Sequence, residues 1–141
     1  MIDLETKGKE TTGALTNGPV FCPVVITLAV MGGKYKPLLL YYIEANKVLR
    51  FGQLRQLVSD ASKKMLTQQL RELEADGLIR RKVYKVVPPK VEYSLTERGE
   101  SLQPVLREMG RWGASQARHY GKSIGHWQKK VDAESVAAHR G

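Results

Sequence analysis

Residues 62–84, SKKMLTQQLRELEADGLIRRKVY, carry the clearest structural signal in the chain. Leu66, Leu70 and Leu73 recur at positions i, i+4 and i+7, a spacing that places all three on one face of an α-helix. Ser62 precedes this pattern, and its side-chain oxygen can accept a hydrogen bond from a backbone N–H of the first turn. The segment therefore predicts an amphipathic helix whose leucine face packs against the rest of the domain.

The other side of this helix is polar and basic. A helical wheel places Lys64, Gln68 and Arg71 opposite the leucines, with Thr67 beside them. Such side chains bond to phosphates and base edges, and glutamine and arginine can pair with adenine and guanine respectively through two hydrogen bonds. Lys63 adds charge at the helix N-terminus, where unpaired N–H groups already attract anions. This face has the chemistry of a helix that reads the major groove of DNA.

A turn and a basic hairpin are expected next. Asp76 and Gly77 end the helix, because glycine adopts the left-handed conformation without a Cβ clash. Residues 78–86 and 91–95 are rich in β-branched and aromatic residues, and the prolines between them fit a loop that joins two strands. The hairpin region is basic throughout residues 78–91: Arg80, Arg81, Lys82, Lys85 and Lys90. Because side chains alternate between the two faces of a strand, these five cannot all point the same way.

Size and composition indicate one globular domain. The chain has 141 residues, of which 42% are hydrophobic and 26% charged, as in folded rather than disordered chains. The longest uncharged apolar run, residues 24–31, is shorter than the ~20 residues that cross a bilayer, and the first residues lack a signal peptide's apolar core. We therefore expect a cytoplasmic protein. A net charge of +9 favours a polyanionic partner, most commonly nucleic acid.

Residues 1–18 are polar, and we expect them to form a flexible arm. Three short helices are expected between this arm and residue 62. The first helix is expected over residues 24–30. The second, over residues 34–45, has the inward-facing residues Leu38, Leu39, Tyr42 and Ile43. A minimal strand at residues 49–51 leads into the third, with apolar residues at helical spacing: Phe51, Leu54, Leu57 and Val58. Its short connection to Ser62 outlines a helix-turn-helix, and the hairpin completes the element order of a winged helix.

Thr96 is expected to cap a last long helix that reaches to about residue 122. The helix has an apolar stripe: Leu102, Val105, Leu106, Met109 and Trp112. The stripe either forms a dimer interface, as in DNA readers with two-fold sites, or caps the domain's own core. The expected fold is mainly α with a small antiparallel β-hairpin (α+β): a winged helix-turn-helix over residues 19–127, with a C-terminal dimerisation helix at about 96–122 and a tail at 128–141.

Short motifs of one known family recur between residues 21 and 120: Cys22-Pro23, Thr27-Leu28, Met31-Gly32-Gly33-Lys34, Arg50-Phe51, Leu54, Lys64, Leu66-Thr67, Leu70-Arg71-Glu72-Leu73-Glu74, Asp76-Gly77-Leu78-Ile79, Tyr84, Val87-Pro88-Pro89, Val91-Glu92-Tyr93, Leu95-Thr96, Gly99, Leu102, Pro104 and Trp112-Gly113. In combination they resemble the HxlR family of bacterial and archaeal winged helix-turn-helix transcription regulators, distantly allied to the MarR type. The resemblance implies a homodimer on an inverted-repeat operator, with dimer contacts from the N-terminal segment and the last helix. Tyr35, where the family usually has tryptophan, and residues 59–61, which replace a more usual glycine-isoleucine turn, depart from the pattern.

These considerations predict a recognition helix at residues 62–76 in the major groove and a wing at residues 80–90 on the backbone or minor groove. Glu72, Glu74 and Asp76 make the C-terminal half of the helix acidic, so its N-terminal half should dock on DNA. No cofactor is expected. The expected DNA-contacting residues are Arg50, Ser62, Lys63, Lys64, Thr67, Gln68, Arg71, Arg80, Arg81, Lys82, Lys85 and Lys90.

Cys22 is the only cysteine, which excludes an internal disulfide framework and a multi-cysteine zinc site. It precedes a helix and lies near Lys34 and Lys36 in sequence, surroundings that favour a reactive thiol. Some redox-sensing members of the HxlR family use a cysteine at this position, which implies an oxidant or electrophile as effector. With one thiol per chain, the switch would be a symmetric Cys22–Cys22 bridge or a mixed disulfide. The alternative is a structural, partly buried cysteine.

An enzyme is not expected. His119, His126 and His139 lack metal-ligand spacing, and no glycine-rich nucleotide motif is present. Two other functions stay open: a winged helix used for protein contacts, and non-specific architectural binding of DNA. The polar, basic face of the recognition helix argues against a protein-contact module. The ratio of specific to non-specific affinity for DNA distinguishes an operator-binding regulator from an architectural protein.

Overall fold

The structure, a computed structural model, describes residue 15, residues 18–19 and residues 22–124. Most of the arm expected at residues 1–18 and the whole tail expected at residues 128–141 lie outside this part of the chain. The elements follow in the order α1 (Val24–Met31), α2 (Lys36–Asn46), β1 (Val48–Arg50), α3 (Phe51–Leu57), α4 (Lys63–Ala75), β2 (Ile79–Tyr84), β3 (Lys90–Leu95), α5 (Glu97–Glu100), α6 (Gln103–Gln116) and the 3-10 helix η2 (Ala117–Tyr120). The architecture is the predicted winged helix-turn-helix.

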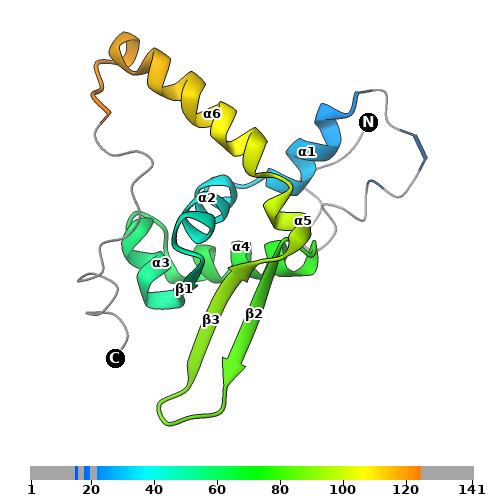
Figure 1. Cartoon of the computed structure of the whole chain (residues 1–141), viewed down its shortest axis with the longest axis vertical. Helices are drawn as coiled ribbons and strands as arrows, with labels where there is room; N and C mark the ends of the chain where they lie inside the picture. Colours follow the sequence, from blue (N-terminus) through cyan, green and yellow to red (C-terminus); the bar gives the residue numbers. More distant parts are fainter. Residues whose placement is uncertain (1–14, 16–17, 20–21, 125–141) are drawn as a thin grey trace.

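The sheet is antiparallel, with the strand order β1-β3-β2. β2 and β3 form the hairpin, in which Ile79 lies opposite Leu95 and Tyr84 opposite Lys90. The short strand β1 pairs with the other edge of β3 and places Leu49 opposite Tyr93. The hairpin extends away from the helices, while α1 and α6 lie at the opposite end of the molecule (Figure 1).

Both ends of α4 form as their sequence predicts. Ser62 Oγ accepts a hydrogen bond of 3.0 Å from the Met65 N–H. Gly77 has φ +74°, the left-handed conformation that glycine adopts most easily. The Thr96 hydroxyl donates to the Gly77 carbonyl at 2.6 Å and accepts from the Gly99 N–H at 3.0 Å, as the predicted cap of α5. One threonine thus joins the end of α4 to the start of the C-terminal helices.

The predicted single long helix after Thr96 is wrong in one respect. The chain forms the short helix α5, turns at Ser101 and Leu102, and then begins α6. Pro104 explains the break, because it has no N–H to donate to the Glu100 carbonyl and its ring would clash with that carbonyl in a continuous helix. Proline is tolerated in the first turn of a helix, which is its position in α6.

The expected inner face of α2 also needs a correction. Leu39 and Ile43 are buried as predicted and Tyr42 packs against the core, but Leu38 is 43% exposed and Leu40 is fully buried. The helix begins at Lys36, later than predicted. Lys36 is itself completely buried.

Lys36 joins α2 to α4 through an ion pair. Its Nζ lies 3.0 Å from Glu72 Oε1, and the Glu72 side chain is only 11% exposed. An ammonium group removed from water is stable only beside an opposite charge, because desolvation disfavours an isolated ion by several kcal/mol. Glu72 therefore points into the protein and is not part of the acidic outer surface expected for the C-terminal half of α4.

Gln69 makes a second polar contact between α4 and the turn before α2. Gln69 Oε1 accepts a hydrogen bond of 2.9 Å from the Tyr35 N–H in a buried setting. Gly33, at φ +151°, lies so close that a Cβ there would be 3.1 Å from the same oxygen. The Tyr35 hydroxyl in turn donates to Asp60 Oδ2 at 3.1 Å, in the turn between α3 and α4. The α1–α2 turn is thereby joined both to α4 and to the turn that precedes α4.

We expect Lys36→Met to lower the free energy of unfolding by about 3–5 kcal/mol, because the Glu72 carboxylate would remain buried without its cation. The double variant Lys36→Met, Glu72→Leu should recover most of this loss, since an apolar pair of similar volume replaces a buried ion pair at little cost. Urea denaturation at one fixed protein concentration measures both.

Lys34→Met is the matched control. It removes the same charge from the ion pair between Lys34 and Asp60, in which the side chains are 73% and 68% exposed respectively. Its effect should stay within about 1 kcal/mol. Equal effects of Lys34→Met and Lys36→Met would contradict a structural role for the buried pair.

Candidate nucleic-acid interface

The outer face of α4 is basic, polar and free of contacts with the protein core. Lys63, Lys64, Gln68 and Arg71 are exposed, and Thr67 is half-buried beside them. Behind them Leu66 and Leu73 are fully buried and Leu70 is 2% exposed. Because the apolar side of α4 is held in the core, the opposite side presents four long polar side chains to solvent, as the leucine spacing predicts.

The two hydroxyl side chains of this face already have partners inside the helix. Ser62 caps it, and Thr67 Oγ1 donates to the Lys63 carbonyl at 2.7 Å. Their oxygens retain free lone pairs, but their first role is to fix the N-terminal turn. The long side chains of Lys63, Lys64, Gln68 and Arg71 are therefore the better candidates for contacts with bases and phosphates.

The wing places its basic residues on two different faces. Arg81 pairs in register with Tyr93 and, across β3, with Leu49, on the face that packs on the core and α4. Arg80 and Lys82 alternate with Arg81 and point to the opposite face. Lys85 is exposed just beyond the end of β2. The basic residues of the wing are therefore divided between two faces, as the alternation of side chains along a strand predicts.

Arg81 belongs to the same surface as Arg71. Its Nε lies 3.4 Å from Glu74 Oε1, so an ion pair joins the wing to the C-terminal half of α4. Burial raises the pKa of the nearby Tyr93 hydroxyl and Glu74 raises it further, while the charges of Arg81 and Arg71 oppose this shift. Both guanidinium groups are thus within electrostatic reach of one phenol. Sequence reasoning did not identify the Glu74–Arg81 contact, because it joins residues on separate elements.

The other face of the wing holds a compact polar cluster. The Nζ atoms of Lys82 and Lys90 each lie 4.8 Å from the centre of the Tyr84 ring. Lys90 Nζ is also 3.6 Å from Glu92 Oε2. The pKa of Glu92 is held below its ordinary value, first by a hydrogen bond from the Tyr84 hydroxyl and further by Lys90 and Arg50. Arg50, Lys82 and Lys90 therefore interact with other residues of the wing. From the sequence, these three residues are expected to contact DNA, because their partners within the wing are not apparent there.

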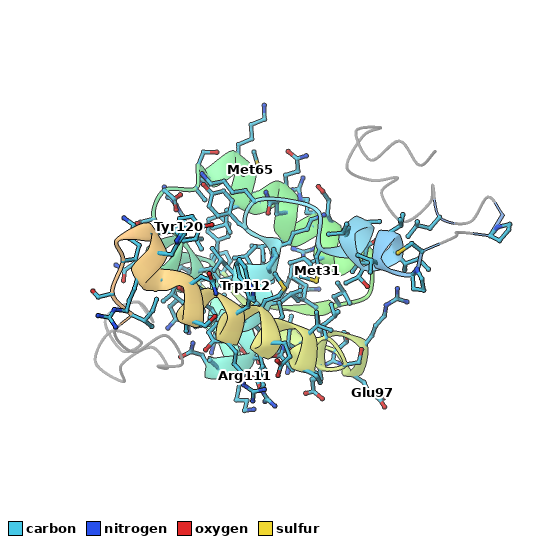
Figure 2. All side chains as sticks on the ribbon, turned by 90° about the horizontal axis from the view of Figure 1, so that it is seen from above. Met31, Met65, Glu97, Arg111, Trp112 and Tyr120 are labelled. Carbon is cyan, nitrogen blue, oxygen red and sulfur yellow. The ribbon has the colours of Figure 1, made fainter. Side chains whose placement is uncertain are left out.

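The helices α1 and α6 lie at the same end of the molecule (Figure 1), and each exposes large apolar side chains in the single chain. On α1, Val24 is 58% and Leu28 56% exposed, although no residue of this helix is charged. On α6, Val105, Met109 and Trp112 are 41%, 48% and 65% exposed. Trp112 and Arg111 project from different sides of α6 (Figure 2). Large apolar groups gathered in this way mark a contact surface more often than a solvated one.

The predicted apolar stripe is divided between two roles. Leu106 is 4% exposed and belongs to the core cluster, and Leu102 is partly buried against the same core. Leu106 is therefore not available for a dimer contact, which corrects its assignment. The physical reason is the width of the stripe, which covers both the side of α6 that faces its own domain and the side that faces outward.

Cys22 is exposed and lies one residue before Pro23, the N-cap of α1. The Lys36 ammonium, expected to influence this thiol, is instead paired with Glu72. In the described part of the chain, no group of three or more His, Cys, Asp or Glu side chains is placed to hold a metal ion. No single described helix is long and apolar enough to cross a membrane, although the pair α1 and α2, bent by 78°, has the length and composition together.

Comparison with known proteins agrees with this geometry. A family model described as HxlR-like helix-turn-helix matches residues 30–120. An uncharacterized HTH-type transcriptional regulator of Bacillus subtilis, YybR, is 52% identical over 94 residues, which cover 67% of this chain and 74% of that protein.

Two solved structures show the same fold. The redox regulator HypR in its oxidized form has 51% identity and a TM-score of 0.63, covering 67% of this chain and 96% of that one. A MarR-family regulator from Porphyromonas gingivalis W83 has 37% identity and a TM-score of 0.60, covering 68% of this chain and 93% of that one.

Proposed function

The chain belongs to the HxlR-like helix-turn-helix family, and from this premise we propose that it binds an inverted-repeat operator as a homodimer. Its relatives are HTH-type transcriptional regulators and not enzymes, so the chain is a DNA-binding regulator of transcription. One observation carries the finer proposal: α4 exposes Lys64, Gln68 and Arg71 on one side, while the leucines of its other side are buried in the core. The unit that binds is residues 19–127.

We assign α4 to the major groove, which is wide enough to admit one α-helix. Lys63 and Lys64 bind phosphates near the helix N-terminus, where the helix dipole adds to their charge. Gln68 suits an adenine and Arg71 a guanine, since each can form two hydrogen bonds with that base. Ser62 and Thr67 hold the N-terminal turn in place and add shorter contacts.

The wing contributes a smaller set of contacts than its charge suggests. Arg81 and Lys85 are the proposed contacts to the backbone or minor groove, because Arg81 shares the α4 side of the sheet and Lys85 extends from the tip. Glu74 orients Arg81 through their ion pair. Arg50, Lys82 and Lys90 support the wing from its other face.

The apolar surface of α1 and α6 is the proposed dimer contact, with Val105, Met109 and Trp112 at its centre and Leu102 at its edge. The proposal requires a two-fold axis at this surface that places both copies of α4 on one side of the dimer. Two such helices read half-sites one helical turn apart, which matches a palindromic operator. A protein-interaction module would instead carry apolar anchors on α4, and an architectural protein would show little preference for the operator over random DNA.

A redox role for Cys22 is a second proposal. It is supported by the exposure of the thiol and by the similarity to a structure titled as a redox regulator. A symmetric disulfide between two subunits, or a mixed disulfide with a small thiol, would change the dimer surface at the start of α1. Oxidant would then alter the affinity for the operator.

Arg71→Ala should weaken binding to the specific operator by about 1–3 kcal/mol and relax the preference at one base pair. Fluorescence anisotropy with operator, single-base variants and random DNA measures both effects. Arg111→Ala is the control, since Arg111 pairs with Glu108 on a different side of α6 and its loss removes the same charge. Equal weakening on operator and random DNA would show that Arg71 contacts phosphate alone.

Met109→Glu combined with Trp112→Glu should weaken the dimer by about 2–4 kcal/mol or more, because two charges replace apolar contacts at the centre of the interface. Sedimentation equilibrium measures the dissociation constant, and circular dichroism verifies the fold. Arg111→Glu on the other side of α6 should leave association unchanged. An unaltered dimer in the double variant would place the interface elsewhere.

Diamide treatment should convert Cys22 to a disulfide, observed by mass spectrometry, and change operator affinity in the same sample. Cys22→Ser should bind operator like the untreated protein and respond to no oxidant. Unchanged binding by fully modified protein would exclude the sensor role.

A further inference from the structure

An open cleft of about 590 Å³ lies between the C-terminal half of α2, the root of the hairpin and the start of α6. These elements meet above the wing, on the side from which α6 extends (Figure 1). The volume falls within the range of about 300–1,000 Å³ typical of small-molecule sites. None of the contacts proposed above for DNA or for a second subunit uses this cleft.

The walls of the cleft have an excess of unpaired positive charge. Arg107 is paired with Glu44 across the cleft, with 3.5 Å between Nη2 and Oε1. Arg80 and Lys47 also line it, and neither forms an ion pair with any residue that the structure describes. Only Glu100 remains as an acidic lining residue without such a pair. A ligand with negative charge would therefore find two cations available.

A buried hydrogen-bond donor without an acceptor lies at the same place. Gln103 lines the cleft and is 5% exposed, and its Nε2 has no hydrogen-bond partner among the described residues. Buried side-chain donors nearly always have an acceptor, and an exception requires an explanation. A ligand oxygen in the cleft that Gln103 lines would supply an acceptor for this amide.

We infer that this cleft binds a small organic carboxylate. Arg80 and Lys47 bind the carboxylate, for which a guanidinium group offers two parallel N–H donors. The Gln103 amide donates to a ligand oxygen, and the apolar side chains of Ile43, Leu95 and Pro104 contact the body of the ligand. Most of the residues that line the cleft are polar or charged, which suits a ligand that carries a charge.

Binding here would reach the wing, a consequence that rests on the proposed function. Arg80 precedes Arg81 on β2, so a ligand that holds Arg80 restrains the strand whose other face pairs with Glu74 of α4. Gln103 belongs to α6, the proposed dimer helix. One ligand would therefore contact both the DNA-binding wing and the element that sets the geometry of the dimer.

Benzoate is the probe, with benzamide as its uncharged analogue. Two-dimensional ¹H–¹⁵N NMR titration of the full chain should show benzoate-dependent shifts at Arg80, Ser94 and Gln103. Benzamide should bind at least about tenfold more weakly than benzoate. Arg80→Gln should weaken benzoate binding by about tenfold, because one charged partner is lost. Arg111→Gln, which removes the same charge outside the cleft, should leave it unchanged.

Several outcomes would overturn the inference: no benzoate binding up to about 10 mM, equal affinity for benzoate and benzamide, shifts confined to other surfaces, or normal affinity in Arg80→Gln. Operator affinity with and without benzoate is a separate measurement. A protein that binds benzoate as expected but fails to bind any operator would support the cleft and contradict the proposed function alone.

Discussion

The anchoring of α4 determines where the DNA contacts proposed for this helix lie. Its leucines are in the core, but apolar burial alone permits a helix to slide or rotate slightly. Gln69, bonded to the Tyr35 backbone, and Glu72, paired with Lys36, add directional contacts on the same inner side. Directional contacts of this kind select one orientation, because a rotated helix would leave a buried charge and a buried amide unpaired. These contacts therefore fix which side of α4 faces the solvent, and that side is the basic one.

The alternation of side chains along β2 is the second constraint. It divides the basic residues of the wing between two faces, and the structure places them in three environments. Arg81 lies on the α4 side, Lys82 takes part in the cluster around Tyr84, and Arg80 faces the cleft beside α6. Net charge therefore overstates the number of phosphate contacts that the wing can make.

The features that the sequence predicts well are those with local causes. The Ser62 cap and the Gly77 turn depend on atoms within a few residues of each other, and the leucine spacing defines the buried side of α4 without knowledge of its neighbours. The break before α6 also has a local cause in Pro104, but the expectation of one long helix after Thr96 missed it. In contrast, the burial of Lys36 depends on Glu72, a partner distant in sequence, and a lysine at a helix start otherwise indicates a solvated charge. Leu106 and Met109 look alike in the stripe of α6, and only the packing of α6 against its own domain separates them. The DNA contacts themselves remain predictions.

The turn between α1 and α2 has a mechanical meaning. The hydrogen bond between Tyr35 and Gln69, beside Gly33, joins this turn to α4, and the hydrogen bond between Tyr35 and Asp60 joins it to the turn before α4. The helix just before it, α1, exposes apolar side chains to whatever adjoins them. A displacement of α1 therefore has to be absorbed at the bend that contains Gly33 or passed on to α4, because the buried hydrogen bond between Tyr35 and Gln69 joins that bend directly to α4.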